Sequence, residues 1–135
     1  MGLILDTSFL VAADREARRG VRGSADAFLI AHKDETFVIT FTVAGELACG
    51  RSAADPYKWQ RWCGLYPVLP WTKDVAWQYG EIHRHLQSAG TPIGANNMWI
   101  AATALVHGMG VVTGNVGDFQ RIPQLVIIPF FQAPP

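Results

Sequence analysis

The chain begins with a short apolar run, residues 3–5, that ends directly at the carboxylate of Asp6. Three apolar residues followed by polar ones predict a short buried strand. Similar runs recur later in the chain, at residues 37–40, 111–113 and 126–128, with a less regular one at 66–69. Helical patterns separate these runs. Short buried strands that alternate with helices predict an α/β fold, a small, mainly parallel sheet flanked by helices.

The helical segments are indicated by apolar spacing and by residues that start or stop helices. The clearest one carries apolar side chains at residues 75, 79, 82 and 86 and ends at Gly90. A second predicted helix, which includes residues 100–105, is apolar on all sides. We therefore expect it to be buried, with Asn96 or Asn97 as its N-cap. The other predicted helices are 9–14, 24–33 with Ser24 as N-cap, 42–49, one opening at Asp55-Pro56, and a short one near Asp118.

The size and composition of the chain limit the classes of protein to which it can belong. Its 135 residues fit a single domain, 1–135, and half of them are hydrophobic, as in a globular protein. The formal net charge is zero, so any nucleic-acid site must be local. No apolar stretch is long enough for a membrane span or a signal peptide. We therefore expect a cytoplasmic protein in which Cys49 and Cys63 are reduced core thiols.

Three acidic residues occupy similar positions relative to the predicted strands. Asp6 ends the first strand, Glu46 lies on the helix after the second, and Asp118 follows the strand at 111–113. Because the carboxyl ends of parallel strands meet at one edge of a sheet, these acids would meet there. Clustered carboxylates need a neutralising charge, and Mg²⁺ or Mn²⁺ prefers oxygen ligands. The alternative at this point is a set of scattered surface carboxylates.

Four local motifs in order distinguish between these alternatives. They are DTS at 6–8, TVAGEL at 42–47, PIGANNMWIAA at 92–102, and VTGNVGDF at 112–119 followed by RIP at 121–123. In this order and spacing the chain resembles the PIN-domain family, and within it the VapC-type toxins of VapBC toxin–antitoxin pairs. The resemblance runs from about residue 3 to residue 126.

The resemblance implies a three-layer fold and a metal-dependent endoribonuclease, the toxin of a type II toxin–antitoxin system. It also implies a cognate VapB-type antitoxin, an RNA substrate and a homodimer. The residues Tyr57, Trp59 and Trp62 on one predicted helix could form the dimer or antitoxin surface. The metal, Mg²⁺ or Mn²⁺, would be held by the catalytic positions Asp6, Glu46, Asn97 and Asp118. Neighbouring polar residues would orient these ligands or the substrate, namely Thr7, Ser8, Thr113 and Asn115.

Asn97 departs from the family pattern, in which this position is usually Asp. An amide oxygen can coordinate a cation but contributes no charge, and the amide NH₂ must point away. Activity could therefore be impaired, and the alternative is a catalytically silent module that binds antitoxin or RNA. Three explanations compete for Asn97, namely natural tolerance, a degraded enzyme and an engineered inactivating substitution. A phosphatase of the haloacid dehalogenase type would need a second Asp where the chain has Ser8.

Other candidate residues carry less of the argument. The basic residues at 15, 18, 19 and 22 form either an RNA-contacting rim or a solvated helix end. The four histidines show no metal-ligand spacing, so we expect structural or surface roles. The five tryptophans could stack on bases, but packing in the core or at a partner interface is the simpler expectation.

Overall fold

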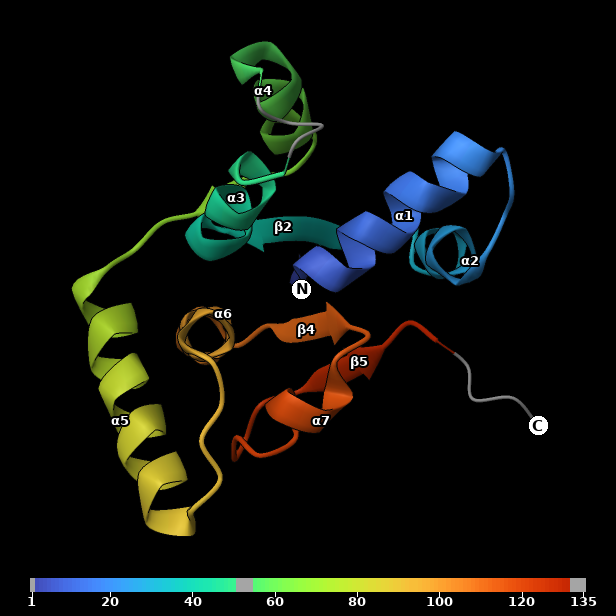
Figure 1. Ribbon diagram of the computed structural model, residues 1–135. Helices are drawn as coiled ribbons and strands as arrows, with labels where there is room; N and C mark the ends of the chain where they lie inside the picture. The colour runs from blue at the N-terminus through green and yellow to red at the C-terminus, as the bar shows by residue number, and fades with distance from the viewer. Residues whose placement is uncertain (1, 51–54, 132–135) are drawn as a thin grey trace.

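The computed structural model describes residues 2–50 and 55–131, and these form a five-stranded parallel sheet with helices around it (Figure 1). The strand order is β3-β2-β1-β4-β5, and all four pairings are parallel, so the predicted sheet is confirmed. The strands are β1 (Gly2–Leu5), β2 (Thr36–Thr40), β3 (Val68–Leu69), β4 (Gly110–Thr113) and β5 (Ile127–Pro129).

Helices follow the strands wherever the sequence predicts them. They are α1 (Thr7–Arg19), α2 (Ser24–Ala31), α3 (Phe41–Ala48), α4 (Pro56–Leu65), α5 (Lys73–Ala89), α6 (Ala95–His107) and α7 (Val116–Phe119). The prediction that the first helix stops at Asp14 is wrong. It continues to Arg19, where an ion pair of 3.0 Å between Asp14 and Arg18 supports the additional turn, and it ends where Gly20 adopts a φ of 64°.

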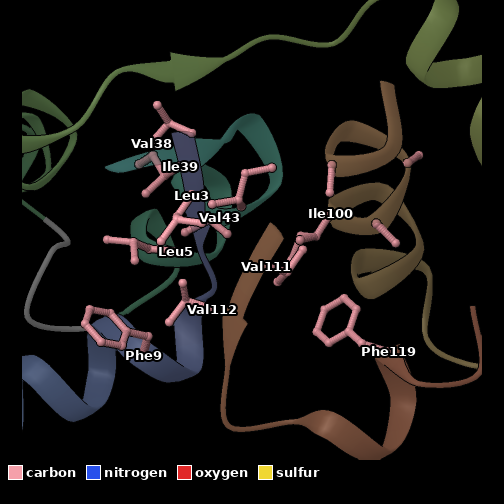
Figure 2. Close-up of a cluster of buried hydrophobic side chains, with 14 of the residues drawn as sticks. Leu3, Leu5, Phe9, Val38, Ile39, Val43, Ile100, Val111, Val112 and Phe119 are labelled. Carbon is pink, nitrogen blue, oxygen red and sulfur yellow. The ribbon is translucent and has the colours of Figure 1, made fainter. Parts of the chain in front are cut away.

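Strands β1 and β4 are buried along their whole length, which shows that helices cover both faces of the sheet. Successive side chains of a strand point to opposite faces. Figure 2 shows Val111 directed toward Ile100 of α6 and the next residue, Val112, directed toward Phe9 of α1. The core therefore has two halves, one on each side of β1 and β4.

Helix α5 has the amphipathic pattern that the sequence indicates. Val75, Ile82 and Leu86 are buried, and Tyr79 stacks on Trp99 of α6 with ring centroids 4.0 Å apart. Within the described ranges, no helix combines the length and the apolar character that a membrane crossing requires.

Helix α2 begins differently from the prediction that Ser24 is its N-cap. Gly23 occupies the cap position and has no side chain to offer, while Ser24 is already helical. The carboxylate of Glu16 on α1 takes over, accepting hydrogen bonds from the backbone N–H groups of Gly23, Ala25 and Asp26 at 2.8–3.0 Å. A residue of one helix thus satisfies the free donors at the start of the next.

Candidate active site

Asp6 stands at the junction between β1 and α1, where it serves as the N-cap of the helix. Its backbone is extended, and one carboxylate oxygen, Oδ1, accepts a hydrogen bond of 2.6 Å from the N–H of Thr7. The backbone N–H of Asp6 donates to the carbonyl of Val112, which continues the β1–β4 pairing. Only 5% of Asp6 is exposed, so the fold itself fixes this carboxylate at the carboxyl end of the sheet.

The second oxygen of Asp6, Oδ2, is held by two hydroxyl groups. Thr113 at the end of β4 donates at 2.6 Å, and Ser8 donates at 3.0 Å. Ser8 also accepts the N–H of Gly114, and Thr113 accepts the N–H of Asn115. Ser8 and Thr113 therefore contact Asp6 through their side chains, as residues that orient a ligand carboxylate would. Asn115 takes part only through its backbone.

Glu46 reaches the same edge of the sheet from α3, the helix that follows β2. The hydroxyl of Thr7 donates to its Oε1 at 2.9 Å, so the residue beside Asp6 fixes Glu46 as well. Its other oxygen, Oε2, lies 3.5 Å from Nδ2 of Asn96 on α6. Sequence reasoning considered Asn96 only as a helix cap, and its place in the motif beside Asn97 was the signal that could have identified it.

Asn97 on α6 faces Asp118 on α7, the short helix that follows β4. Nδ2 of Asn97 donates to Oδ2 of Asp118 at 3.1 Å, and both residues are half-buried. The prediction that Asn96 or Asn97 caps α6 is wrong, because Gly94 is the N-cap and the helix starts at Ala95. Asn97 consequently lies inside the first turn, which leaves its side chain free to contact Asp118.

These contacts form a chain across the edge of the sheet. Asp6 and Thr7 are adjacent, Thr7 holds Glu46, Asn96 approaches Glu46, and its neighbour Asn97 holds Asp118. The structure therefore brings the four predicted site residues to one edge. The side chains are linked through hydroxyl and amide groups, and within the described part of the chain no three Asp, Glu, His or Cys side chains form a group that could hold a metal ion.

The electrostatics of the site are one-sided. The two salt bridges between described residues, Arg18 with Asp14 and Arg84 with Glu81, leave the three site acids without a basic partner. Buried carboxylates are ordinarily stabilised by such a partner, by hydrogen bonds or by a bound cation, and of the three acids only Asp6 is buried. The donor chemistry, three carboxylates and an amide, is therefore the chemistry that a hard divalent cation prefers. Beside Thr7 and Glu46 the surface opens into a hollow of about 120 Å³.

The remaining candidates lie away from this site. His83, His85 and His107 are exposed, and His32 stacks on Phe28 at 4.0 Å, as expected for surface and structural residues. Both cysteines are free thiols, but the prediction that both lie in the core is wrong for Cys49. Cys49 is the C-cap of α3 and is exposed because the chain leaves the core there.

The tryptophans divide into two groups. Trp59, Trp62 and Trp99 pack against the core, in line with the expectation of packing, and Trp59 Nε1 also donates to the carbonyl of Ala44 at 2.9 Å. Trp71 and Trp77 are more than half exposed. Of the predicted partner surface on α4, Tyr57 is exposed, whereas Trp59 and Trp62 are half-buried.

Several known proteins share this sequence pattern and this architecture. Ribonuclease VapC1 of Rickettsia felis is 29% identical over 95% of this chain and 96% of its own length. Ribonuclease VapC10 of Mycobacterium tuberculosis is 29% identical over 91% of this chain and 90% of its own.

Solved structures of similar proteins have the same fold as this chain. VapBC-1 from nontypeable Haemophilus influenzae superposes with a TM-score of 0.80 at 26% identity, covering 98% of this chain and 100% of that one. VapBC2 from Rickettsia felis, bound to a promoter DNA fragment, gives 0.79 at 24% identity, covering 96% and 98%. The model of the PIN domain matches residues 3–125. Most of the chain is thus accounted for, and the protein belongs to the PIN domain family.

Proposed function

We propose that this protein is an endoribonuclease that requires Mg²⁺ or Mn²⁺ and hydrolyses RNA phosphodiester bonds as the toxin of a type II toxin–antitoxin module. One observation carries the proposal. Asp6, Glu46 and Asp118 lie along the carboxyl edge of a parallel sheet, linked through Thr7, Asn96 and Asn97, and no basic side chain in the described ranges forms a salt bridge with any of them. The likeness to proteins named ribonuclease VapC supports the same conclusion.

The residues that would hold the metal are Asp6, Glu46, Asn97 and Asp118. When bound, such an ion lowers the pKa of a water molecule and stabilises negative charge on a phosphate. Ser8 and Thr113 fix the orientation of Asp6, and Thr7 fixes that of Glu46. Because Nδ2 of Asn97 faces Asp118, the amide oxygen Oδ1 is the atom left to face a cation. In the described ranges these acids do not form a group of three that could hold an ion, so a shared ion would need them to move closer together.

The partners follow from the same likeness. Solved relatives are VapBC complexes, which supports a VapB-type antitoxin as the binding partner of this chain. RNA is the substrate, and single-stranded segments suit a site at the open edge of a sheet because their nucleotides are accessible. We further propose a homodimer and a cytoplasmic location.

The test is cleavage of total RNA in Mn²⁺ and in EDTA, with a variant that removes one site charge. Asp6→Asn should abolish Mn²⁺-dependent cleavage, because the buried carboxylate is the best-fixed group at the site. Asp34→Asn is the matched control, since Asp34 is exposed and lies outside the site. Cleavage that persists in EDTA, or that Asp6→Asn leaves unchanged, would refute the proposal.

A catalytically silent module that binds antitoxin or RNA is the second candidate. The observation that favours it is the hydrogen bond between Asn97 and Asp118, which gives the carboxylate of Asp118 a partner without any cation. An intact fold that binds RNA but does not cleave it in Mg²⁺ or Mn²⁺ would decide for this candidate.

A further inference from the structure

Among the described residues, one buried side-chain polar atom has no hydrogen-bond partner, and it lies close to a candidate active-site acid in the sequence. This atom is Oγ1 of Thr42, in the first turn of α3 and four residues before Glu46. Only 9% of Thr42 is exposed, and Oγ1 itself has almost no contact with solvent. A buried hydroxyl without a partner costs free energy, so its presence calls for a physical reason.

The position of Thr42 at the start of the helix explains why the backbone gives its hydroxyl no acceptor. A threonine inside a helix can donate to the carbonyl three or four residues before it. For Thr42 those carbonyls belong to Val38 and Ile39, which lie in β2. The cap of α3 is already made by Thr40, whose hydroxyl accepts the N–H of Val43 at 3.2 Å. Neither the helix nor its cap uses the hydroxyl of Thr42.

Thr42 and Glu46 share one face of α3, because they are one helical turn apart. Side chains of a helix lean toward its N-terminus, so the Glu46 side chain extends over the turn that contains Thr42. On this face Glu46 contacts Thr7 of α1 and Asn96 of α6, and α3 packs against both helices (labelled in Figure 1). The unpartnered hydroxyl therefore lies on the buried side of an active-site carboxylate.

The carboxylate of Glu46 has capacity for another donor. Its Oε1 accepts the hydroxyl of Thr7 at 2.9 Å, but its Oε2 is 3.5 Å from Nδ2 of Asn96, which is long for such a bond. In the described ranges the site acids do not form a group of three that could hold an ion, so Glu46 must move if it is to share one. Such a movement changes its hydrogen bonds, and Thr42 has a free donor on the same helix face.

We infer that Thr42 is a positioning residue, whose hydroxyl donates to the carboxylate of Glu46 when a divalent cation is bound and so fixes that ligand on the ion. This inference rests on the proposed function. Hydrogen bonds from outer groups orient metal ligands, and the loss of one typically lowers metal affinity by about 10–100-fold. The hydroxyl that has no partner in the present structure gains one when the ion binds, which removes the cost of leaving it alone.

The test measures the dissociation constant for Mn²⁺, from the EPR signal of the unbound ion, and the melting temperature in EDTA. Thr42→Val keeps the shape of the side chain but removes the hydroxyl, so it should raise the dissociation constant at least about tenfold. Its melting temperature in EDTA should be equal or higher, because the lost group has no partner there. Thr42→Ser keeps the hydroxyl and should bind Mn²⁺ as the unmodified protein does.

Thr103→Val is the matched control, because Thr103 is also buried but donates to the carbonyl of Trp99 at 2.8 Å. It should melt slightly lower in EDTA and bind Mn²⁺ normally. A double-mutant cycle tests whether Thr42 acts through Glu46. Glu46→Ala should weaken Mn²⁺ binding, and the addition of Thr42→Val should then cause no further loss.

The outcomes separate this inference from the proposed function. An unchanged Mn²⁺ affinity in Thr42→Val, or an undiminished effect of Thr42→Val in the Glu46→Ala background, would overturn the inference even if RNA is cleaved. A lower melting temperature of Thr42→Val in EDTA would also overturn it, because the hydroxyl would already have a partner. If Thr42→Val weakens Mn²⁺ binding but the unmodified protein cleaves no RNA, the inference stands and the nuclease proposal fails. A protein that binds no Mn²⁺ would overturn both.

Discussion

Asn97 decides how the negative charge of the site is balanced in the absence of metal. Its amide donates to Asp118, so the two half-buried side chains attract each other. We predict that Asn97→Asp replaces this hydrogen bond by repulsion and lowers the free energy of unfolding in EDTA by roughly 1–3 kcal/mol. Mn²⁺ should restore that stability, because a dication gains more from a fourth carboxylate than from an amide. Urea unfolding with EDTA and with Mn²⁺ measures both effects.

Asn97→Ala is the matched control for this prediction. It removes the hydrogen bond without adding a charge, so it should be destabilised in EDTA but should gain less from Mn²⁺ than Asn97→Asp does. If Asn97→Asp and the unmodified protein respond equally to Mn²⁺, position 97 lies outside any metal site.

The hydroxyl of Thr113 is the second residue whose removal should matter. It donates to the buried carboxylate of Asp6 at 2.6 Å and accepts the N–H of Asn115. Thr113→Val keeps the shape but leaves both groups short of a partner, so we expect a loss of about 2–3 kcal/mol in the free energy of unfolding.

Thr103→Val provides the comparison, because Thr103 is equally buried but its hydroxyl donates only to the carbonyl of Trp99 in its own helix. That change should cost less than about 1 kcal/mol, since the carbonyl remains within the backbone pattern of α6. Equal losses in the two variants would show that Thr113 has no special relation to Asp6.

The sequence reveals the acids of the site more readily than the contacts between them. Asp6 could be predicted because a buried strand ends there, and Glu46 and Asp118 because they follow neighbouring strands. The contact from Asn97 to Asp118 could not be predicted, since it depends on the helix beginning at Ala95 rather than at Asn97. A shift of two residues in a helix start rotates a side chain by more than half a turn.

Among the elements, α2 depends on a residue from another helix. Glu16 receives three backbone hydrogen bonds at the start of α2. Desolvation acts to raise the pKa of this carboxyl, but the three bonds, from Asp26, Ala25 and Gly23, leave the pKa below its ordinary value. The ionised form is thus favoured in the folded protein. Its contribution to stability is present above the unfolded pKa, about 4.3, and is lost as the pH falls through the folded pKa.

We therefore predict that Glu16→Gln lowers stability at neutral pH and flattens the fall in stability below about pH 4.3. Glu81→Gln, which alters an exposed acid paired with Arg84 on α5, should change both quantities far less. Melting temperatures recorded from pH 3 to pH 7 measure the difference, and parallel pH profiles for Glu16→Gln and the unmodified protein would contradict the prediction.

The elements themselves were the most predictable level of the structure. Apolar patterns together with helix start and stop signals indicated the seven helices and five strands of the described residues, including the short β3 at Val68–Leu69, although α1 extends beyond its predicted end. The residue that caps the start of α2 was not predicted, because Glu16 lies on the preceding helix and reaches across the loop. No local pattern encodes such a contact, and it becomes visible only when α1 and α2 are packed together.

For the whole molecule, we predict a homodimer at micromolar concentration. Large apolar side chains remain exposed on the described surface, among them Tyr57 at 76%, Leu65 at 68% and Trp77 at 67%. A dimer interface that covers such side chains would remove their apolar surface from water. Sedimentation velocity across a concentration series measures the mass directly, and a species that stays monomeric throughout would count against the prediction.

The order of the strands affects how the protein folds during its synthesis on the ribosome. β1 lies in the middle of the sheet and pairs with β4, which follows it by more than a hundred residues in the chain. Such distant pairings form late, because the intervening chain must exist before they can close. Asp6 is synthesised long before Thr113, so their hydrogen bond can form only after the chain that spans their 107-residue separation has been made. A nascent or prematurely terminated chain that lacks β4 therefore carries an incomplete centre, and the geometry of the site arises only after β4 has paired with β1.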